Sequence, residues 1–277
     1  MRPNIVRNVI CSGLLSAILS APLYAATEHE FPLREQFPDV ATISTEGLYN
    51  EYEALTIIDA RTRFEYDTIH IDKAIRVPVS SKSFLALLEK RVPDQNARIA
   101  FYCNGFACSK SYRAVRKAVA YGYSNSVSFD AGIFSWANAY PGHTTLLGKP
   151  LAGPSALISK QQFEARQISY ESFRKKAKET PAVVIDVRDA AQRRNSDGSK
   201  NELPDMPVLG RERYQRINLD LFKRKLSEGK FLDQQLLIFD ATGKQIRWLQ
   251  YSLQQNGYTN YHFLAGGIYA VNQRVHQ

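Results

Sequence analysis

The sequence contains few of the residues and motifs on which metal, nucleotide and membrane functions depend. Of its 277 residues, three are cysteine, two are methionine and five are histidine. The histidines are scattered and none has a metal-ligand spacing, so we expect no metal site and no cofactor. The sequence has no glycine-rich phosphate-binding motif. Its longest apolar run, at the N-terminus, is too short for a stable membrane span.

The N-terminal segment has the anatomy of a secretory signal peptide. Two arginines precede an apolar run from 9 to 21, and Leu23-Tyr-Ala25 offers small residues for cleavage. We therefore expect residues 1–25 to be removed and the protein to be exported, to the periplasm in a Gram-negative bacterium. Cys11 precedes the apolar run instead of following it, so lipidation is not expected.

The composition is that of a folded globular protein with a basic surface. Hydrophobic residues make up 44% of the chain, which is ordinary for a globular protein. The formal net charge of +9 falls to +7 when the signal peptide takes two arginines and no acids with it. The basic residues are dispersed, without a lysine-arginine block or an aromatic-interleaved patch. We therefore expect no nucleic-acid partner.

Removal of the signal peptide leaves only Cys103 and Cys108, which lie in one short segment. The apolar run Ile99–Tyr102 predicts a buried strand, and Asn104-Gly105 predicts a turn. A helical pattern begins at Ser109. One face of the predicted helix carries Tyr112, Val115, Ala118 and Val119.

This order places Cys103 at the carboxyl end of a strand and under the N-terminus of a helix. Ligands bind at that edge of open α/β sheets. The helix dipole and the free backbone N–H groups favour an anion, so we expect a lowered pKa for the Cys103 thiol. The alternative from these residues alone is a buried structural cysteine.

Three segments together resemble the rhodanese family of sulfurtransferases, which carry sulfur as a cysteine persulfide. The first is the Cys103 loop itself. The second, Ile57–Pro78, is similar to the family's Asp-x-Arg strand end and its Gly-His-Ile-x-Gly-Ala signature, although Ile69 and Lys73 replace the glycines. The third, Asp130–Trp136, is similar to the closing Gly-Gly-x-x-x-Trp segment. The three occur in the family's order.

The resemblance implies an enzyme in which Cys103 carries sulfur from a small anionic donor such as thiosulfate. The acceptor is then cyanide or a thiol, of a small molecule or of a protein. The loop implied to bind the donor and the persulfide comprises Asn104, Gly105, Phe106, Ala107, Cys108, Ser109 and Lys110. Ser109 is equally a helix N-cap, and Lys110 equally part of a solvated helix face. We interpret Asp59 and Arg61 as a strand-end ion pair or hydrogen bond that fixes neighbouring loops. Glu65 and His70 are interpreted as fold determinants, with acid–base catalysis as the alternative.

The chain repeats itself once. Thr56–Arg61 has a counterpart in Val183–Arg188, and the strand before Cys103 has one that ends at Asp240. Strands alternating with helical patterns predict an α/β fold with a parallel sheet flanked by helices in each half. The expected organisation is two tandem rhodanese-like domains, at 26–148 and at 161–277, joined by a linker at 149–160.

The two halves differ in their chemistry. Asp240 stands at the position of Cys103, and a carboxylate cannot form a persulfide. A long polar insertion, Gln192–Arg216, replaces the His-Ile signature. Asp240 is interpreted as a solvated or helix-capping residue, with a general base or anion sensor as the alternative. We expect the second half to be non-catalytic and to wall one side of a cleft at the first.

Two other functions compete with sulfur transfer. Cys103 and Cys108 could cycle between dithiol and disulfide, which would make the protein a thiol redox protein, with Cys108 the redox partner. A rhodanese pair without turnover would instead be a binding module. Phosphatases of the same fold need an arginine six residues after the cysteine. Ser109 occupies that position, which disfavours a phosphatase.

Overall fold

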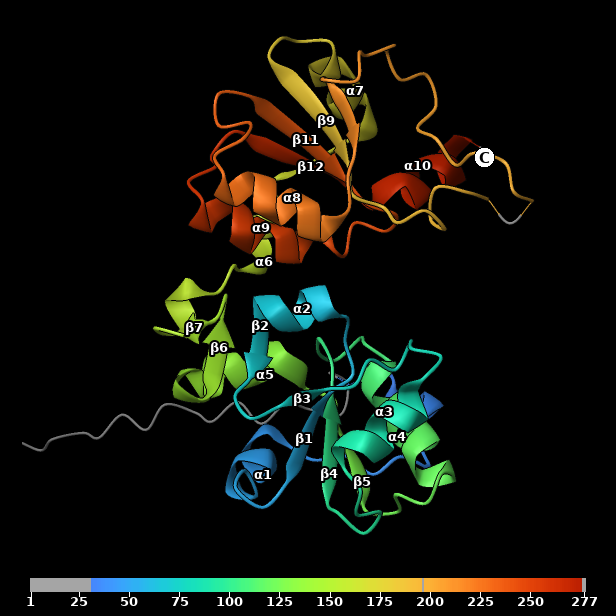
Figure 1. Cartoon of the computed structure of the whole chain (residues 1–277), viewed down its shortest axis with the longest axis vertical. Coiled ribbons are helices and arrows are strands. Elements are labelled where there is room, and N and C mark those ends of the chain that lie inside the picture. Colours follow the sequence, from blue (N-terminus) through green and yellow to red (C-terminus); the bar gives the residue numbers. More distant parts are fainter. Residues whose placement is uncertain (1–30, 196, 276–277) are drawn as a thin grey trace, which may run out of the picture.

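The computed structural model of the chain describes residues 31–195 and 197–275. The predicted signal peptide lies outside these residues. The described part consists of two parallel β-sheets, each flanked by helices, and one small antiparallel sheet (Figure 1). The α/β fold class expected from the alternating strand and helix patterns is confirmed.

The first sheet has four parallel strands in the order β3-β1-β4-β5. Thr42 adds a parallel bridge to Ser128 at the β5 edge. The strands are β1 (Thr56–Asp59), β3 (Ile75–Arg76), β4 (Ile99–Tyr102) and β5 (Ser126–Phe129). Its helices are α1 (Thr45–Asn50), α2 (Arg63–Thr68), α3 (Phe84–Arg91), α4 (Lys110–Ala120) and α5 (Gly132–Ala139).

The second sheet has five parallel strands in the order β10-β9-β11-β12-β8, which repeats the arrangement of the first. The strands are β8 (Gln167–Ile168), β9 (Ala182–Asp186), β10 (Tyr214–Arg216), β11 (Gln235–Phe239) and β12 (Tyr261–Leu264). Its helices are α6 (Lys160–Glu164), α7 (Tyr170–Ala177), α8 (Leu219–Ser227), α9 (Ile246–Gln255) and α10 (Gly267–Val275). The internal repeat seen in the sequence is therefore a repeat of strand order.

A three-stranded antiparallel sheet stands beside the first sheet. It consists of β2 (Ile69–Ile71), β6 (Thr144–Leu146) and β7 (Lys149–Pro150). Three short 3-10 helices, at Arg34–Gln36, Pro141–His143 and Pro154–Ala156, connect other elements. Lys73 replaces a glycine of the rhodanese signature that Ile57–Pro78 resembles. Its φ is +66°, so the turn has a left-handed backbone there without glycine.

The strand that precedes Cys103 is buried along its whole length, as the apolar run predicts. The helical pattern after it is also confirmed, because α4 begins at Lys110 and Tyr112, Val115 and Ala118 are buried. Val119, placed on the same face by the sequence, is 45% exposed, so that part of the prediction is wrong. Val119 lies on the same side of the helix as Tyr112 and Val115, but in the last turn of α4, one residue before the helix ends.

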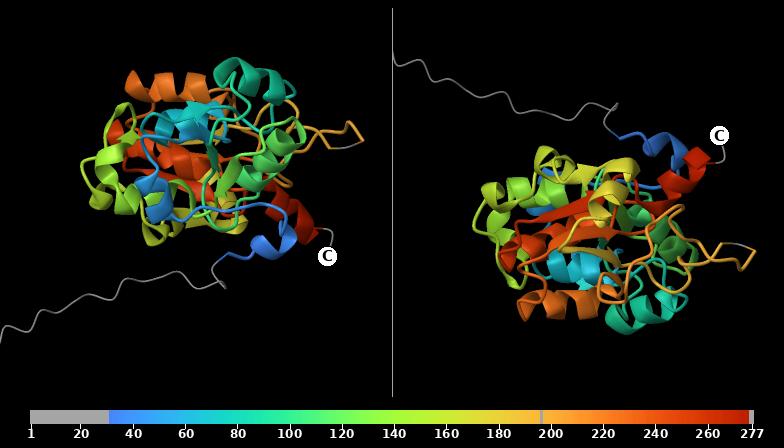
Figure 2. Two further views of the ribbon diagram at one scale, coloured as in Figure 1. Left: turned by 90° about the horizontal axis from the view of Figure 1, so that it is seen from below. Right: turned by 90° about the horizontal axis from the view of Figure 1, so that it is seen from above.

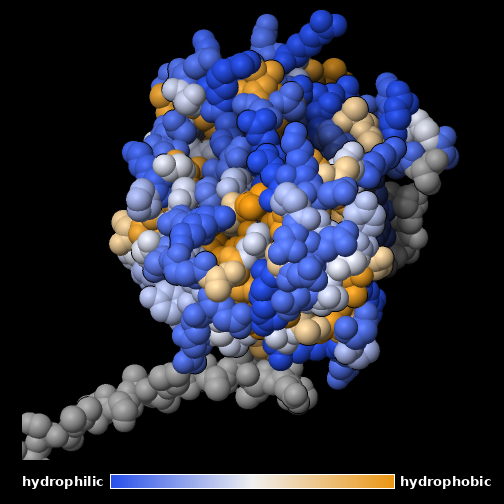
Figure 3. Space-filling view, turned by 60° about the horizontal axis from the view of Figure 1, so that its bottom comes forward, coloured by the Kyte–Doolittle hydropathy of each residue, from blue (hydrophilic) through white to orange (hydrophobic). Residues whose placement is uncertain are grey.

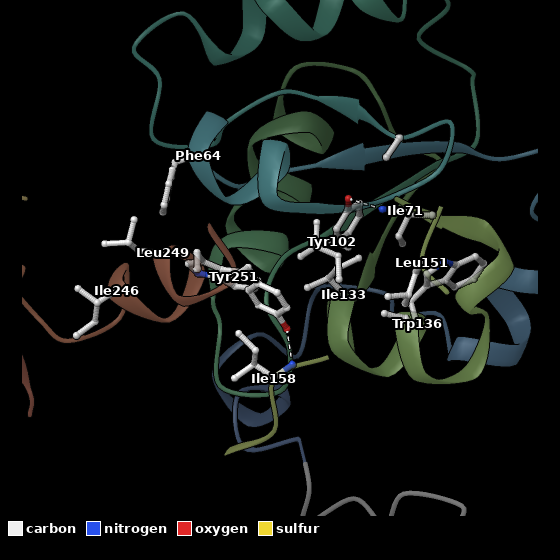
Figure 4. Close-up of a cluster of buried hydrophobic side chains, with 14 of the residues drawn as sticks. Phe64, Ile71, Tyr102, Ile133, Trp136, Leu151, Ile158, Ile246, Leu249 and Tyr251 are labelled. Carbon is white, nitrogen blue, oxygen red and sulfur yellow. Dashed lines mark hydrogen bonds between the residues drawn. The ribbon is translucent and has the colours of Figure 1, made fainter. Parts of the chain in front are cut away.

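The two halves share one buried cluster of hydrophobic side chains (Figure 4). Helix α2 of the first half packs against α9 of the second. Phe64 comes from α2, and Ile246 and Leu249 come from α9. Tyr251 of α9 accepts a hydrogen bond from the backbone N–H of Ile158, at 2.9 Å. This packing brings the start of α9 to the edge of the first sheet where Cys103 lies.

The outer surface is mostly hydrophilic on the face shown in Figure 3, with small scattered hydrophobic patches. Within the described residues, no helix combines the length and the apolar character that a bilayer crossing requires. Figures 1 and 2 show that the insertion of the second half projects from the body of the molecule as a loop.

Candidate active site

Cys103 follows β4 directly and opens the loop 104–109, which leads into α4. The backbone N–H of Cys108 donates to the Gly105 carbonyl at 2.8 Å and closes a turn within the loop. The backbone N–H of Ile133, at the start of α5, donates to the Cys103 carbonyl at 3.0 Å. The strand–loop–helix arrangement expected from the sequence is therefore present. The N-terminus of α5 also holds the start of the loop, through the hydrogen bond from Ile133 to Cys103.

Glycine at position 132 lets α5 approach the loop this closely. A Cβ atom at Gly132 would lie 2.4 Å from the backbone nitrogen of Gly105, and its φ of +70° is in the left-handed region. Gly105 itself has a φ of +145°. Both positions therefore require the backbone freedom of glycine. A side chain at position 132 would push the loop away from α5.

The Cys103 thiol is fully buried. Its Sγ lies 3.1 Å from the Cys108 carbonyl oxygen and 3.6 Å from the Ser111 hydroxyl. Burial, and then the neighbouring Cys108 side chain, raise the pKa of Cys103 well above its ordinary value. The expected lowering of the Cys103 pKa is therefore wrong. The sequence could not show that the helix-end environment is outweighed by loss of contact with water.

The thiol with the lowered pKa is that of Cys108, not that of Cys103. A hydrogen bond from the Cys103 side chain lowers the pKa of Cys108 to about 6, and burial only partly opposes this. Backbone N–H groups of Asn104 and Lys110 contribute further, as does the charge of Lys110. The raised pKa favours the protonated form of Cys103, and the lowered pKa favours the thiolate form of Cys108. The two cysteines are both free thiols in the structure.

Glu65 of α2 ties the loop to the rest of the first half. Its carboxylate accepts from Asn104 Nδ2 at 2.8 Å and from Lys110 Nζ at 2.9 Å. It also accepts from the backbone N–H and the hydroxyl of Thr62, as the second partner of a capping box. Burial raises its pKa, but Lys110, Arg61 and the Asn104 hydrogen bond outweigh it and lower the pKa to about 2. Glu65 is thus a buried carboxylate that stays ionised and holds both ends of the loop.

Asp59 and Arg61 form the strand-end ion pair expected from the sequence. Both side chains are fully buried, with Arg61 Nη2 2.6 Å from Asp59 Oδ2. Arg61 also donates to the Ile69 carbonyl at 2.6 Å and to Asn104 Oδ1 at 3.3 Å. The pair therefore joins β1, β2 and the loop. The charge of Arg61 is neutralised by Asp59 and is not presented to a ligand.

The remaining loop residues have distinct surroundings. Phe106 is half-buried, and its ring meets Phe31 edge-on at 4.8 Å between centroids. Ala107 is the exposed residue of the loop. Ser109 occupies the N-cap position of α4, but its side chain makes no capping hydrogen bond. Lys110 is engaged by Glu65, so its charge is partly offset before any donor arrives.

The counterpart loop of the second half keeps the same framework around Asp240. The Ile268 backbone N–H donates to the Asp240 carbonyl at 3.1 Å, and Gly267 approaches Ala241 as closely as Gly132 approaches Gly105. The Asp240 carboxylate is buried and accepts from the backbone N–H groups of Thr242, Gly243 and Gln245. Asp240 is therefore not solvated. Its carboxylate satisfies the amides at the start of α9, as a capping residue does.

Helix α9 brings two side chains against Arg61 and Phe134 of the first half. Trp248 lies against Arg61, 5.3 Å from guanidinium to ring centroid, and stacks on Phe134 at 5.2 Å between centroids. Arg247 lies over the Phe134 ring at 4.1 Å. Its Nε is buried and has no hydrogen-bond partner among the described residues. Burial lowers the pKa of Arg247.

The sequence reasoning missed Ser111, Arg247 and Trp248 as neighbours of the site. Ser111 was detectable, since it lies eight residues after Cys103 on the buried face of the predicted helix. Arg247 and Trp248 gave no signal, because their proximity depends on how the halves pack. His70 stacks on Tyr66 at 4.0 Å between centroids, which fits its interpretation as a fold determinant.

Comparison with known families places this site in a known domain. The family model described as "Rhodanese-like domain" matches residues 44–139, about a third of the chain. The match contains β1, β4, the Cys103 loop and α4. No curated protein matches the sequence.

Several solved structures are similar to parts of the chain. A rhodanese-related protein from Thermoplasma volcanium is 25% identical, over 36% of this chain and 92% of its own, with a TM-score of 0.31. The thiosulfate sulfurtransferase from Pseudomonas aeruginosa is 17% identical, over 86% of this chain and 43% of its own, with a TM-score of 0.37. A human single-domain sulfurtransferase is 20% identical, over 35% of this chain and 95% of its own, with a TM-score of 0.30.

Proposed function

Because residues 44–139 belong to the rhodanese-like domain family, we propose that the protein is a sulfurtransferase whose sulfur carrier is Cys103. The observation that supports this most is the pairing of Cys103 with a low-pKa Cys108 inside the strand–loop–helix segment. The donor is a small anionic sulfur compound such as thiosulfate, and the acceptor is a thiol or cyanide.

The raised pKa of Cys103 requires a base for sulfur transfer, and the Cys108 thiolate is suited to that role. In the first step Cys103 attacks the outer sulfur of the donor while its proton passes to Cys108. The donor's sulfur–sulfur bond breaks, and when the donor is thiosulfate the leaving group is sulfite. Cys103 then holds the sulfur as a persulfide anion. An acceptor thiolate or cyanide attacks that sulfur, and the returning Cys103 thiolate recovers its proton from Cys108.

The fully buried position of Cys103 means that a donor must displace part of the loop to reach it. Loop residues after Gly105 are the part able to move, since Asn104 and Lys110 at the two ends are held by Glu65. Backbone amides of the loop, together with Lys110, would face the donor and the persulfide. Arg247, which has no acidic partner among the described ion pairs, would add positive charge from the second half.

In this proposal the second half does no sulfur chemistry. Asp240 cannot carry sulfur, and its carboxylate is already bound by the amides of its own loop. Its contribution is structural, through α9, whose first turn contacts Phe134 of α5 and Arg61, which itself donates to Asn104.

A thiol redox function is the second candidate, and the low pKa of Cys108 favours it. Cys108 could attack the inner sulfur of the Cys103 persulfide anion and form the Cys103–Cys108 disulfide, while its proton passes to the outer sulfur, which leaves as hydrosulfide. It could equally resolve a sulfenic acid on Cys103, with loss of water. After mild peroxide and then thiol, wild type should recover activity and Cys108→Ser should not. Equal recovery of both proteins would remove the redox role.

We also propose that the protein is exported, on the basis of its N-terminal sequence alone. Protein purified from the native cell should begin near Ala26 or Thr27 by N-terminal sequencing. An intact Met1 on the soluble protein would refute export by cleavage.

The test of the proposed function compares two cysteine variants in a thiosulfate-to-cyanide transfer assay. Cys103→Ser should abolish turnover, since a hydroxyl cannot carry a persulfide. Cys108→Ser should retain slow turnover with a pH dependence shifted to higher pH, because the base is lost while the carrier remains. Wild-type activity in Cys103→Ser would exclude Cys103 as the carrier. Complete loss in Cys108→Ser alone would assign the carrier role to Cys108.

A further inference from the structure

A cavity of about 270 Å³ lies in the second half, away from the Cys103 loop. It opens where β9 and β10 end, since Arg188 follows β9 by two residues and Arg216 is the last residue of β10. Ligands of open α/β sheets bind outside the carboxyl ends of the strands. The lining side chains that carry charge are Arg188, Arg193, Arg194, Lys200, Glu202 and Arg216.

The cavity has a strong excess of positive charge. Five cationic side chains and one carboxylate line it, and Asp186 beneath adds a second carboxylate, which leaves three positive charges without a counter-charge. Arg188 is committed to Asp186, and Arg216 to Glu202 at 2.9 Å. None of the ion pairs among the described residues involves Arg194 or Lys200. Arg194 donates one hydrogen bond to the Gly198 carbonyl at 3.0 Å, which leaves its charge uncompensated, so the charges of these two cations are available to a ligand.

Arg193 adds a poorly satisfied donor inside the cavity wall. Its Nε is buried and has no hydrogen-bond partner in the described part of the chain, although Asp186 Oδ2 lies 3.4 Å away. A buried guanidinium nitrogen without a partner is costly. An oxyanion in the cavity would supply acceptors to the guanidinium groups that line it, in the forked geometry that arginine favours.

The insertion that forms this cavity is held in place by specific hydrogen bonds. Arg188 Nη1 donates to the Asn201 carbonyl at 2.7 Å, and the Asn201 backbone N–H donates to the Arg193 carbonyl at 3.0 Å. Arg194 and Lys200 pair as an antiparallel bridge, which sets their backbones side by side. In the first half the corresponding Arg61 instead holds the Cys103 loop. The second half has thus redirected its strand-end arginine to the insertion.

We propose that the insertion of the second half forms a binding site for a small doubly charged oxyanion, of the class of phosphate, sulfate, sulfite or thiosulfate. The cavity is smaller than the roughly 300–1,000 Å³ typical of pockets for larger organic ligands. A small anion with its hydrating water fits that volume, and three uncompensated positive charges match a dianion. The site is separate from the Cys103 loop and does not depend on its chemistry.

The experiment is calorimetric titration of the full mature chain with inorganic phosphate at constant ionic strength and pH 7.5. Phosphate is the probe because it has no sulfur to transfer to a thiol. Wild type should bind it saturably at one site. Arg194→Gln combined with Lys200→Gln should weaken binding about tenfold or more, since it removes two charge-assisted donors. Both side chains are exposed and outside the described ion pairs, so the double variant should fold, which circular dichroism checks.

Two further variants locate the binding. Lys178→Gln removes an exposed charge of the same half outside the cavity and should leave binding unchanged. Arg193→Gln should weaken binding as the double variant does. Repeating the titration with sulfate, sulfite and thiosulfate identifies which anion binds most tightly. Absence of saturable phosphate binding to wild type would overturn the proposal. So would binding that survives the double variant but is lost in Lys110→Gln, which would place the anion at the Cys103 loop.

Discussion

Replacing Glu65 by glutamine should destabilise the protein strongly at neutral pH and hardly at all in acid. The Glu65 carboxylate is 6% exposed and accepts charge-assisted hydrogen bonds from the Lys110 ammonium and from the Asn104 amide. Burial raises its pKa, but these two neighbours and the charge of Arg61 outweigh burial and lower the pKa from 4.5 to about 2. Each unit of that pKa difference corresponds to roughly 1.4 kcal/mol, so ionised Glu65 contributes about 3 kcal/mol to the free energy of unfolding. The variant should lose about that much.

The pH dependence follows from the direction of this shift. Because the pKa is lower in the folded chain, the stabilisation is complete above about pH 4.5 and is lost as the pH falls toward 2. Urea unfolding of wild type and Glu65→Gln should therefore give free energies of unfolding that differ by about 3 kcal/mol at pH 7 and converge between pH 4.5 and 2.

Glu89→Gln is the matched control, since Glu89 is an exposed acid of the first half. Its effect should stay within about 0.5 kcal/mol at every pH. A Glu65→Gln deficit that is the same at pH 2 and pH 7 would show that Glu65 stabilises by packing and not by its charge. The assignment of Glu65 as the ionised anchor of the loop would then be wrong.

The other predictions concern the thiol pair and the second half. The alkylation rate of Cys108, followed by peptide mapping, should rise with a midpoint near the pKa of about 6, and Cys103→Ala should raise that midpoint because it removes the strongest stabilising hydrogen bond. Asp240→Ala should cost about 1–3 kcal/mol in urea unfolding, since three backbone amides lose their acceptor, while sulfur transfer per folded molecule stays unchanged. Arg247→Met should be neutral or stabilising by up to about 2 kcal/mol, yet should raise the KM for thiosulfate; an unchanged KM would remove Arg247 from donor binding.

Patterns of local sequence predicted the framework of the fold and the position of the site. The apolar runs before Cys103 and Asp240 are strands β4 and β11, and the helical pattern after Ser109 is α4. The Asp59–Arg61 ion pair also followed from its position at a strand end. These features depend on a few neighbouring residues, so a single sequence carries them.

The electrostatics of the site could not be predicted in the same way. Whether Cys103 or Cys108 holds the charge depends on burial and on the direction of loop amides, which are properties of the folded loop. The contact of Arg247 with the first half and the basic cavity of the insertion depend on packing between distant segments. The sequence gives charges and order along the chain, but not these distances.

In the proposed reaction, Cys103 carries the sulfur and Cys108 assists it. Intact mass spectrometry of the mature protein after exposure to thiosulfate, without acceptor or reductant, tests it directly. Wild type and Cys108→Ser should each gain the mass of one sulfur atom, mapped to Cys103, and Cys103→Ser should gain none. A sulfur mapped to Cys108 in wild type, or retained in Cys103→Ser, would show that Cys103 is not the sulfur carrier.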